Sequence, residues 1–129
     1  MLAKTLKTYP LSILCALGIV VLSLAPMPEV PQLADVPLFD KWVHFVMYGV
    51  LSLLIWWEMR RHITIRPSIL WGLIASGLLG GLLELGQAYL TTCRSGEWMD
   101  FLADAIGALL GSILGLAIRH IWRRHKERT

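Results

Sequence analysis

The sequence predicts an all-α integral membrane protein, a bundle of four transmembrane helices with both termini in the cytoplasm. Its composition, four long apolar stretches and the placement of its basic residues all favour this class. Of the 129 residues, 56% are hydrophobic and 16% are charged, whereas roughly 25% are charged in a typical soluble domain. Because a small soluble domain cannot bury so much apolar material, the composition disfavours a soluble enzyme, a nucleic-acid-binding module and a disordered tail.

Four stretches of the chain are long enough to cross a bilayer. A spanning helix needs about 20 mainly apolar residues, with a range of about 17–25, and the stretches 9–25, 39–57, 68–90 and 101–122 meet this requirement. They are too long for β-strands and lack the alternating pattern of an outer-membrane barrel. No internal repeat or change of composition divides the chain, so we expect a single domain over residues 1–129.

Basic residues set the expected orientation, because lysine and arginine concentrate in cytoplasmic loops. Ten of the twelve lie before the first stretch, between the second and third, or at and beyond the end of the fourth: Lys4, Lys7, Arg60, Arg61, Arg66, Arg119, Arg123, Arg124, Lys126 and Arg128. The other two are Lys41 and Arg94. Both termini and the middle connection are therefore expected in the cytoplasm, with segments 26–38 and 91–99 outside.

The first stretch has a second interpretation. Lys4 and Lys7 before an apolar run are also typical of a secretory signal peptide. A cleavage site after Ala25 would place Pro26 directly beyond the cut, which is unfavourable for cleavage. We therefore expect the first span to be retained in the membrane.

Small residues predict how two of the helices pack. Gly107, Gly111 and Gly115 recur every four residues in the fourth stretch, so they share one face. A similar face of small residues runs from 72 to 80 in the third stretch. Because apolar side chains gain little by leaving lipid, membrane helices associate through close contact at such faces. We expect the third and fourth helices to pack tightly, although glycine is also common in membrane helices generally.

Nine side chains near the ends of the spans do not suit a lipid environment. They open the second and fourth helices, close the third, or lie in the connection before the fourth: Asp40, Lys41, His44, Tyr48, Glu84, Gln87, Arg94, Asp100 and Asp104. In the expected topology all nine lie at the external end of the bundle. No comparable group is expected in the cytoplasmic halves of the spans.

Two interpretations of this polar group stay open, a functional site and a buried network that docks the helices. Glu84 lies about six residues before the end of its helix, roughly 9 Å deep. Ionisable groups at such depth usually face a bundle interior, a partner or water. Asp40 and Asp100 precede helices and are candidate N-caps or partners of the helix dipole. Lys41 alone is typical of a snorkelling boundary residue, and His44 alone of a satisfied interior histidine.

Three short blocks around this polar group resemble those of a known family: Asp40-Lys41-x-x-His44-Phe45 with Tyr48, then Glu84-x-x-Gln87, then Arg94 with Asp100, Gly107 and Gly111. Through them the chain resembles the VanZ-like membrane proteins over about residues 35–115. The family usually has asparagine where this chain has Asp104. An ionised carboxylate has no N–H donors, so we expect Asp104 to pair with Arg94 or Lys41, or to stay protonated.

The resemblance implies a location and a context. The family takes its name from a teicoplanin-resistance protein, and no reaction is established for its members. It implies an envelope-modulating protein of the bacterial inner membrane, with an external polar site. The expected partners are membrane lipids, a lipid-linked wall precursor or a glycopeptide. No cofactor is expected, an oligomer is possible, and the resemblance does not decide whether this chain affects antibiotic resistance.

Other functions compete with binding. The polar group could be purely structural, or the chain could be a small transporter, for which four spans would require an oligomer. A membrane enzyme would use His44 as base with Asp40 orienting it, and Glu84 or Asp104 as acid. The chain has no Walker loop, no G-x-S-x-G and no HExxH motif. The polar group contains one histidine beside several carboxylates, which is a weak ligand set for zinc. We therefore lean away from an enzyme and expect no metal and no nucleic-acid partner.

Overall fold

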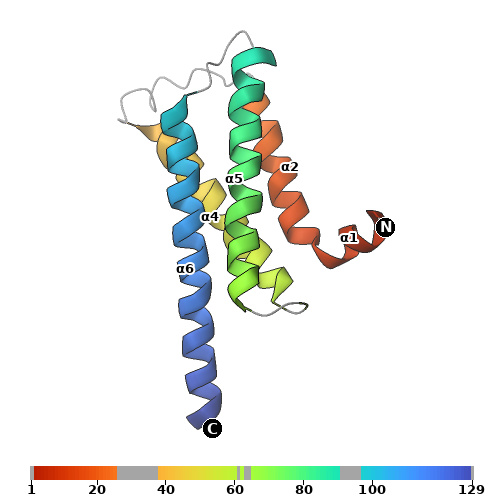
Figure 1. Cartoon of the computed structure of the whole chain (residues 1–129), viewed down its shortest axis with the longest axis vertical. Helices are drawn as coiled ribbons and strands as arrows, with labels where there is room; N and C mark the ends of the chain where they lie inside the picture. The colour runs from red at the N-terminus through yellow and green to blue at the C-terminus, as the bar shows by residue number, and fades with distance from the viewer. Residues whose placement is uncertain (1, 26–37, 61, 63–64, 91–96, 129) are drawn as a thin grey trace.

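The described residues of the computed structural model are 2–25, 38–60, 62, 65–90 and 97–128. They form five helices: α1 (Leu2–Thr8), α2 (Pro10–Leu24), α4 (Phe39–Met59), α5 (Ile65–Leu90) and α6 (Trp98–Arg128). This part of the chain contains no strand, which confirms the all-α prediction. Figure 1 shows the four longer helices side by side, with α1 turned away from the bundle.

Three helices have the length and composition of membrane spans: Phe39–Met59, Ser68–Leu90 and Trp98–Arg128. This is therefore a multi-pass membrane protein. The remaining apolar helix, α2, has 15 residues, or about 22 Å at 1.5 Å per residue. That is shorter than the hydrocarbon core of about 30 Å. The helix α6 extends beyond the predicted stretch 101–122 at both ends, because polar flanking residues continue the helix while the prediction counted only its apolar part.

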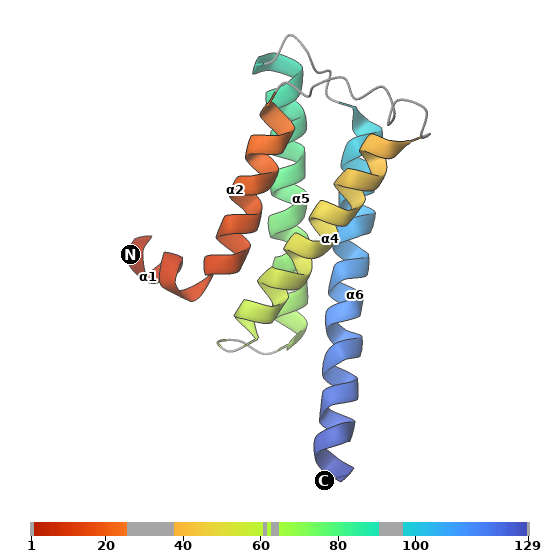
Figure 2. The same ribbon diagram turned by 180° about the vertical axis from the view of Figure 1, so that it is seen from behind.

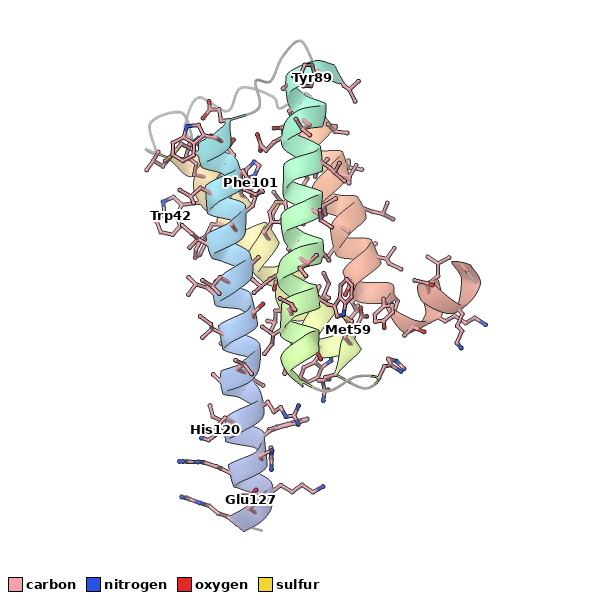
Figure 3. All side chains as sticks on the ribbon, viewed as in Figure 1. Trp42, Met59, Tyr89, Phe101, His120 and Glu127 are labelled. Carbon is pink, nitrogen blue, oxygen red and sulfur yellow. The ribbon has the colours of Figure 1, made fainter. Side chains whose placement is uncertain are left out.

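The outer surface of the bundle is more apolar than that of a soluble protein. Large apolar residues point outward along every helix of the bundle, among them Leu14, Leu82 and Leu114; Figure 3 shows such side chains around the bundle, including Trp42. Several serines lie in the interior beside apolar side chains such as Leu51, and Ser52 and Ser112 share a hydrogen bond of 2.7 Å between α4 and α6. Lipid solvates the apolar surface, while close helix contact favours small residues inside.

The glycine face of α6 packs against α4. A Cβ atom added at Gly107 would overlap the carbonyl of Phe45, and one added at Gly111 would overlap the carbonyl of Gly49. At Gly115 an added Cβ would lie 2.8 Å from the indole of Trp56. The expectation that these glycines face the third span was therefore wrong. Gly49 leaves the backbone of α4 open, so two backbones can approach there without intervening side chains.

The small residues of α5 accommodate polar side chains instead of another backbone. A Cβ added at Gly80 would lie 2.7 Å from Asp104 Oδ2, and one at Gly72 would lie 3.2 Å from the hydroxyl of Ser52. Gly77 has no such neighbour within 4 Å. The face from 72 to 80 thus makes room for side chains of α6 and α4, which places the carboxyl group of Asp104 between helices.

A buried glutamate anchors the start of α2. Glu58 of α4 accepts hydrogen bonds from the backbone N–H groups of Leu11 and Ser12, at 2.9 and 3.1 Å, and from the hydroxyl of Ser12 at 2.6 Å. The N-cap residue Tyr9 offers no side-chain cap of its own. Glu58 therefore caps α2 from another helix. Glu58 lies one residue beyond the predicted stretch 39–57, and the sequence did not reveal its partners, which are 46 and 47 residues away in the chain.

The other end of α2 is also attached by a polar side chain. Gln87 of α5 donates a hydrogen bond from Nε2 to the backbone carbonyl of Ser23 at 2.8 Å. The two attachments hold α2 against α4 at one end and against α5 at the other, as Figure 2 shows from behind. Gln87, one of the nine polar residues, thus has a structural contact with α2.

Replacing Glu58 by alanine is expected to lower the free energy of unfolding by about 2 kcal/mol, because two helix N-terminal donors and a buried hydroxyl lose their acceptor. Glu58→Gln keeps one acceptor oxygen and should cost less. Thermal melting in detergent measures both variants. Glu127→Ala, at an exposed position of α6, is the control. Equal melting temperatures for Glu58→Ala and this control would contradict the capping role.

Candidate functional site

The starts of α4 and α6 and the end of α5 meet at one end of the bundle (Figure 1). Eight described polar residues of this end form an external polar cluster, so named for its expected side of the membrane: Asp40, Lys41, His44, Tyr48, Glu84, Glu97, Asp100 and Asp104. Gln87 contacts α2 instead. Arg94 lies outside the described residues. Glu97 was missed by the sequence analysis, although its position just before the helix start at Trp98 could have suggested it.

Lys41 is the centre of an ion-pair network that joins α4 to α6. Its Nζ lies 2.8 Å from Asp40 Oδ2, 2.8 Å from Asp100 Oδ1 and 3.0 Å from Glu97 Oε2. The Lys41 side chain is only 18% exposed. It is therefore no simple snorkelling residue, and its charge is already matched by carboxylates.

Asp40 and Asp100 are not N-caps. Both lie in the first turn of their helices, and the N-cap position of α4 is Leu38 in a left-handed conformation. The N-cap alternative was wrong for Asp40 because α4 begins at Phe39, one residue earlier. Both carboxylates still lie at the positive end of a helix dipole, where a negative charge is favourable.

A buried histidine–aspartate pair lies one turn deeper. His44 Nδ1 lies 2.9 Å from Asp104 Oδ1, and both side chains are at most 7% exposed. The rings of His44 and Tyr48 stack nearly parallel, with centroids 6.3 Å apart. The expected partners of Asp104 were Arg94 or Lys41. The structure pairs Asp104 with His44, while Lys41 contacts Asp100, one turn nearer the helix start. Arg94 lies outside the described residues.

The pair fixes the chemistry of the imidazole. With Asp104 ionised, Nδ1–H donates to the carboxylate, which sets the tautomer and ring orientation. In the described part of the chain, the other oxygen Asp104 Oδ2 and the hydroxyl of Tyr48 have no hydrogen-bond partner, although both are buried. Buried polar groups normally have partners. At this depth of the cluster, one carboxylate oxygen and one hydroxyl are therefore buried without a described partner.

Glu84 connects the end of α5 to the start of α6. Its Oε2 accepts a hydrogen bond from the backbone N–H of Glu97 at 2.7 Å. Ligand atoms of Glu84, His44 and Asp100 all lie within 4.8 Å of one another. One nitrogen and two carboxylate oxygens could surround a metal ion or a donor group of a ligand. One of these three residues, Asp100, already contacts the ammonium of Lys41. The expectation that the chain binds no metal stays a prediction.

The charges of the cluster favour a particular kind of ligand. Its described carboxylates are Asp40, Glu84, Glu97, Asp100 and Asp104, and its described basic groups are Lys41 and His44. This excess of acceptors suits amines, hydroxyls and amide N–H groups better than phosphates. The acid content thus distinguishes the cluster from the basic sites that proteins use for phosphate.

An apolar cavity adjoins the cluster. Its volume is about 100 Å³, and it lies between α2 and α4. Most of the wall is apolar, from Leu22, Phe39, Val43 and Met47, while Ser23, Asp40 and His44 supply the polar part. An amphiphilic group could place its apolar portion against this wall and its polar portion near His44, which is the usual division of a binding pocket.

The enzyme hypothesis requires a revision of its residue roles. Asp40 was the expected orienting group for His44, but Asp104 holds the imidazole and Asp40 contacts Lys41. Within the described residues, His44 has no hydrogen bond to a serine, threonine or cysteine that would serve as its nucleophile. The pair is therefore a base with an orienting carboxylate, without the third member of a nucleophilic triad.

No protein-family model, no curated protein and no solved structure matches this chain. The fold and the cluster define its class as a multi-pass α-helical membrane protein with a polar, acid-rich end. The resemblance to the VanZ-like family stays a prediction from the sequence blocks.

Proposed function

We propose that the chain is a four-span, VanZ-like protein of the bacterial cytoplasmic membrane, with α2 as its shortest span. The packing of α2 against α4 and α5 supports this, because both of its ends are held at the depth of the neighbouring spans. Local thinning of the bilayer accommodates a short span at modest cost. The ten basic residues on one side favour cytoplasmic termini.

Single-cysteine labelling tests this topology. In a variant that lacks Cys15 and Cys93, a cysteine at position 96 should react with a membrane-impermeant thiol reagent applied from outside. A cysteine at position 64 should react only after the membrane is permeabilised. External labelling at 64 with none at 96 would reverse the orientation, and the cluster would then face the cytoplasm.

We further propose that the external polar cluster binds the polar head of an amphiphilic envelope component, and that the protein thereby modulates the envelope. Candidate ligands are a lipid, a lipid-linked wall precursor or a glycopeptide. The observation that carries this proposal is the acid-rich cluster around His44 and Asp104, next to an apolar cavity. Amine and hydroxyl groups of such ligands would meet carboxylates, and their apolar chains would meet the cavity wall and lipid.

A structural role is the second candidate, because Lys41, His44 and Glu84 each connect two helices or their ends. Glu84→Gln separates the two candidates. Glutamine keeps a carbonyl oxygen that can accept from the N–H of Glu97, so the fold should survive while the charge is lost. A binding site that depends on charge should then fail in a folded protein.

The experiment is complementation of a strain that lacks the gene, with growth measured against teicoplanin and other wall-active glycopeptides and lipopeptides. Glu84→Gln is expected to abolish complementation with nearly unchanged expression and melting. Glu127→Gln makes the same change on the exposed tail and should complement fully.

Arg94→Lys keeps the positive charge but loses the planar guanidinium fork, so it should fail to complement if Arg94 holds a carboxylate or a phosphate. Activity lost only in proportion to stability would favour the structural role.

A further inference from the structure

The end of the bundle opposite the external polar cluster carries a second concave site. The segment from Trp98 to Trp122 is about 36 Å long, so α6 reaches past a hydrocarbon core of about 30 Å. In Figure 3, His120 and Glu127 lie on α6 beyond the level of Met59, where α4 ends. A cavity of about 290 Å³ lies between this part of α6 and the end of α4.

Tryptophan rings hold one cation in this cavity. The guanidinium carbon of Arg60 lies 3.6 Å from the ring centroid of Trp57 and 6.0 Å from that of Trp122. The centroids of these two rings are 6.1 Å apart. Cation–π contacts of this kind fix the position of a guanidinium. Arg60 is therefore oriented at the cavity, and less conformational freedom is lost when it binds an anion.

Three further cations reach the cavity from α6. Arg119, Arg123 and Lys126 line it, and their spacing of four and three residues places them on one helix face. They make no ion pair with any described residue, and no described carboxylate lines the cavity. Three like charges on one helix face beside a small volume repel one another, so an anion next to them is favourable.

We propose that this cavity binds the phosphate of an anionic phospholipid headgroup. Arginine forks match phosphate oxygens, and tryptophans are typical of the membrane–water interface, where headgroups lie. Basic pockets between spans are known to bind such headgroups. The apolar wall of Trp57 and Trp122 would contact the glycerol and the first acyl carbons. This site is independent of the proposed function, since it lies at the other end of the bundle.

Lipid titration of the full chain in a neutral detergent tests the proposal. Binding is measured as the rise in melting temperature with phosphatidylglycerol, with phosphatidylcholine, and with inorganic phosphate. The pocket variant is R119Q/R123Q. The matched control R124Q/R128Q removes the same charge from the same helix at positions that do not line the cavity. Glutamine retains good helix propensity, and melting without lipid checks that both variants fold.

Phosphatidylglycerol should stabilise the unchanged chain and the control variant, and phosphatidylcholine should not. The pocket variant should bind phosphatidylglycerol roughly tenfold or more weakly, since each basic residue near a membrane surface contributes about 1 kcal/mol. If that variant does not fold, Lys126→Gln at the exposed end of the cavity should give a smaller loss of the same kind. Equal weakening in pocket and control variants would overturn the site, as would equal stabilisation by phosphatidylcholine or by inorganic phosphate.

Discussion

Gly111→Leu is expected to lower the free energy of unfolding by at least about 3 kcal/mol, because even a Cβ atom there would overlap the carbonyl of Gly49. A leucine would force α6 away from α4 and separate the hydroxyls of Ser52 and Ser112, which now hydrogen-bond. It would also shift the helix faces that carry His44 and Asp104. Folded yield and thermal melting in detergent would both show the loss.

The control for this prediction is Gly77→Leu, the same change at a glycine with no neighbour within 4 Å of an added Cβ. It should alter stability by less than about 0.5 kcal/mol. Leu114→Ala, on the outward face of α6 at 51% exposure, should also be mild. If all three variants melted alike, the close α4–α6 contact at Gly111 would be refuted.

Asp104→Ala should cost roughly 1–3 kcal/mol, because His44 Nδ1–H would lose its buried acceptor. Asp104→Asn keeps a carbonyl oxygen toward His44 and should cost about 1 kcal/mol or less. Asparagine is also the residue that the family resemblance leads one to expect at this position, so the fold should tolerate it. Melting of both variants in detergent, beside unchanged protein, gives the comparison.

A double-mutant cycle isolates the pair itself. Combining Asp104→Ala with His44→Ala should reveal a coupling free energy of about 0.6 kcal/mol, the average for hydrogen bonds between membrane helices, and at most about 1.7 kcal/mol. Asp40→Ala is the control, since its carboxylate is 53% exposed and Lys41 keeps Glu97 and Asp100 as partners. Strictly additive effects of the two alanine substitutions would mean that the contact contributes nothing.

The class of the protein follows from the sequence because membrane spans have a strong one-dimensional signal. An apolar run of about 20 residues predicts a helix wherever it occurs, and the spans containing α4, α5 and α6 were predicted to within a few residues on their apolar parts. Helices in alternating directions bring the start of α4, the end of α5 and the start of α6 to one end. The polar residues of one end are therefore predictable as a group from the sequence alone.

The contacts among these polar residues could not be predicted from the sequence. Helical periodicity shows which residues share a face, but it does not show which neighbour that face meets. In lipid all apolar faces are solvated alike, so shape at the closest approach decides the neighbour, and Gly49 directs the α6 glycines toward α4. The same packing brings Asp104 to His44, a pair separated by 60 residues in the chain.

The sequence by itself determined the helical membrane class, the helix spans of α4, α5 and α6, and the set of residues at each end. Only the tertiary structure decided that Lys41 serves three carboxylates, that Glu58 caps α2, and that Arg60 lies over Trp57 beside the basic face of α6. The physical reason is that the two kinds of property depend on interactions over different separations along the chain. Span formation depends on transfer of local segments into lipid, whereas polar partners are chosen by helix–helix geometry between residues far apart in the chain.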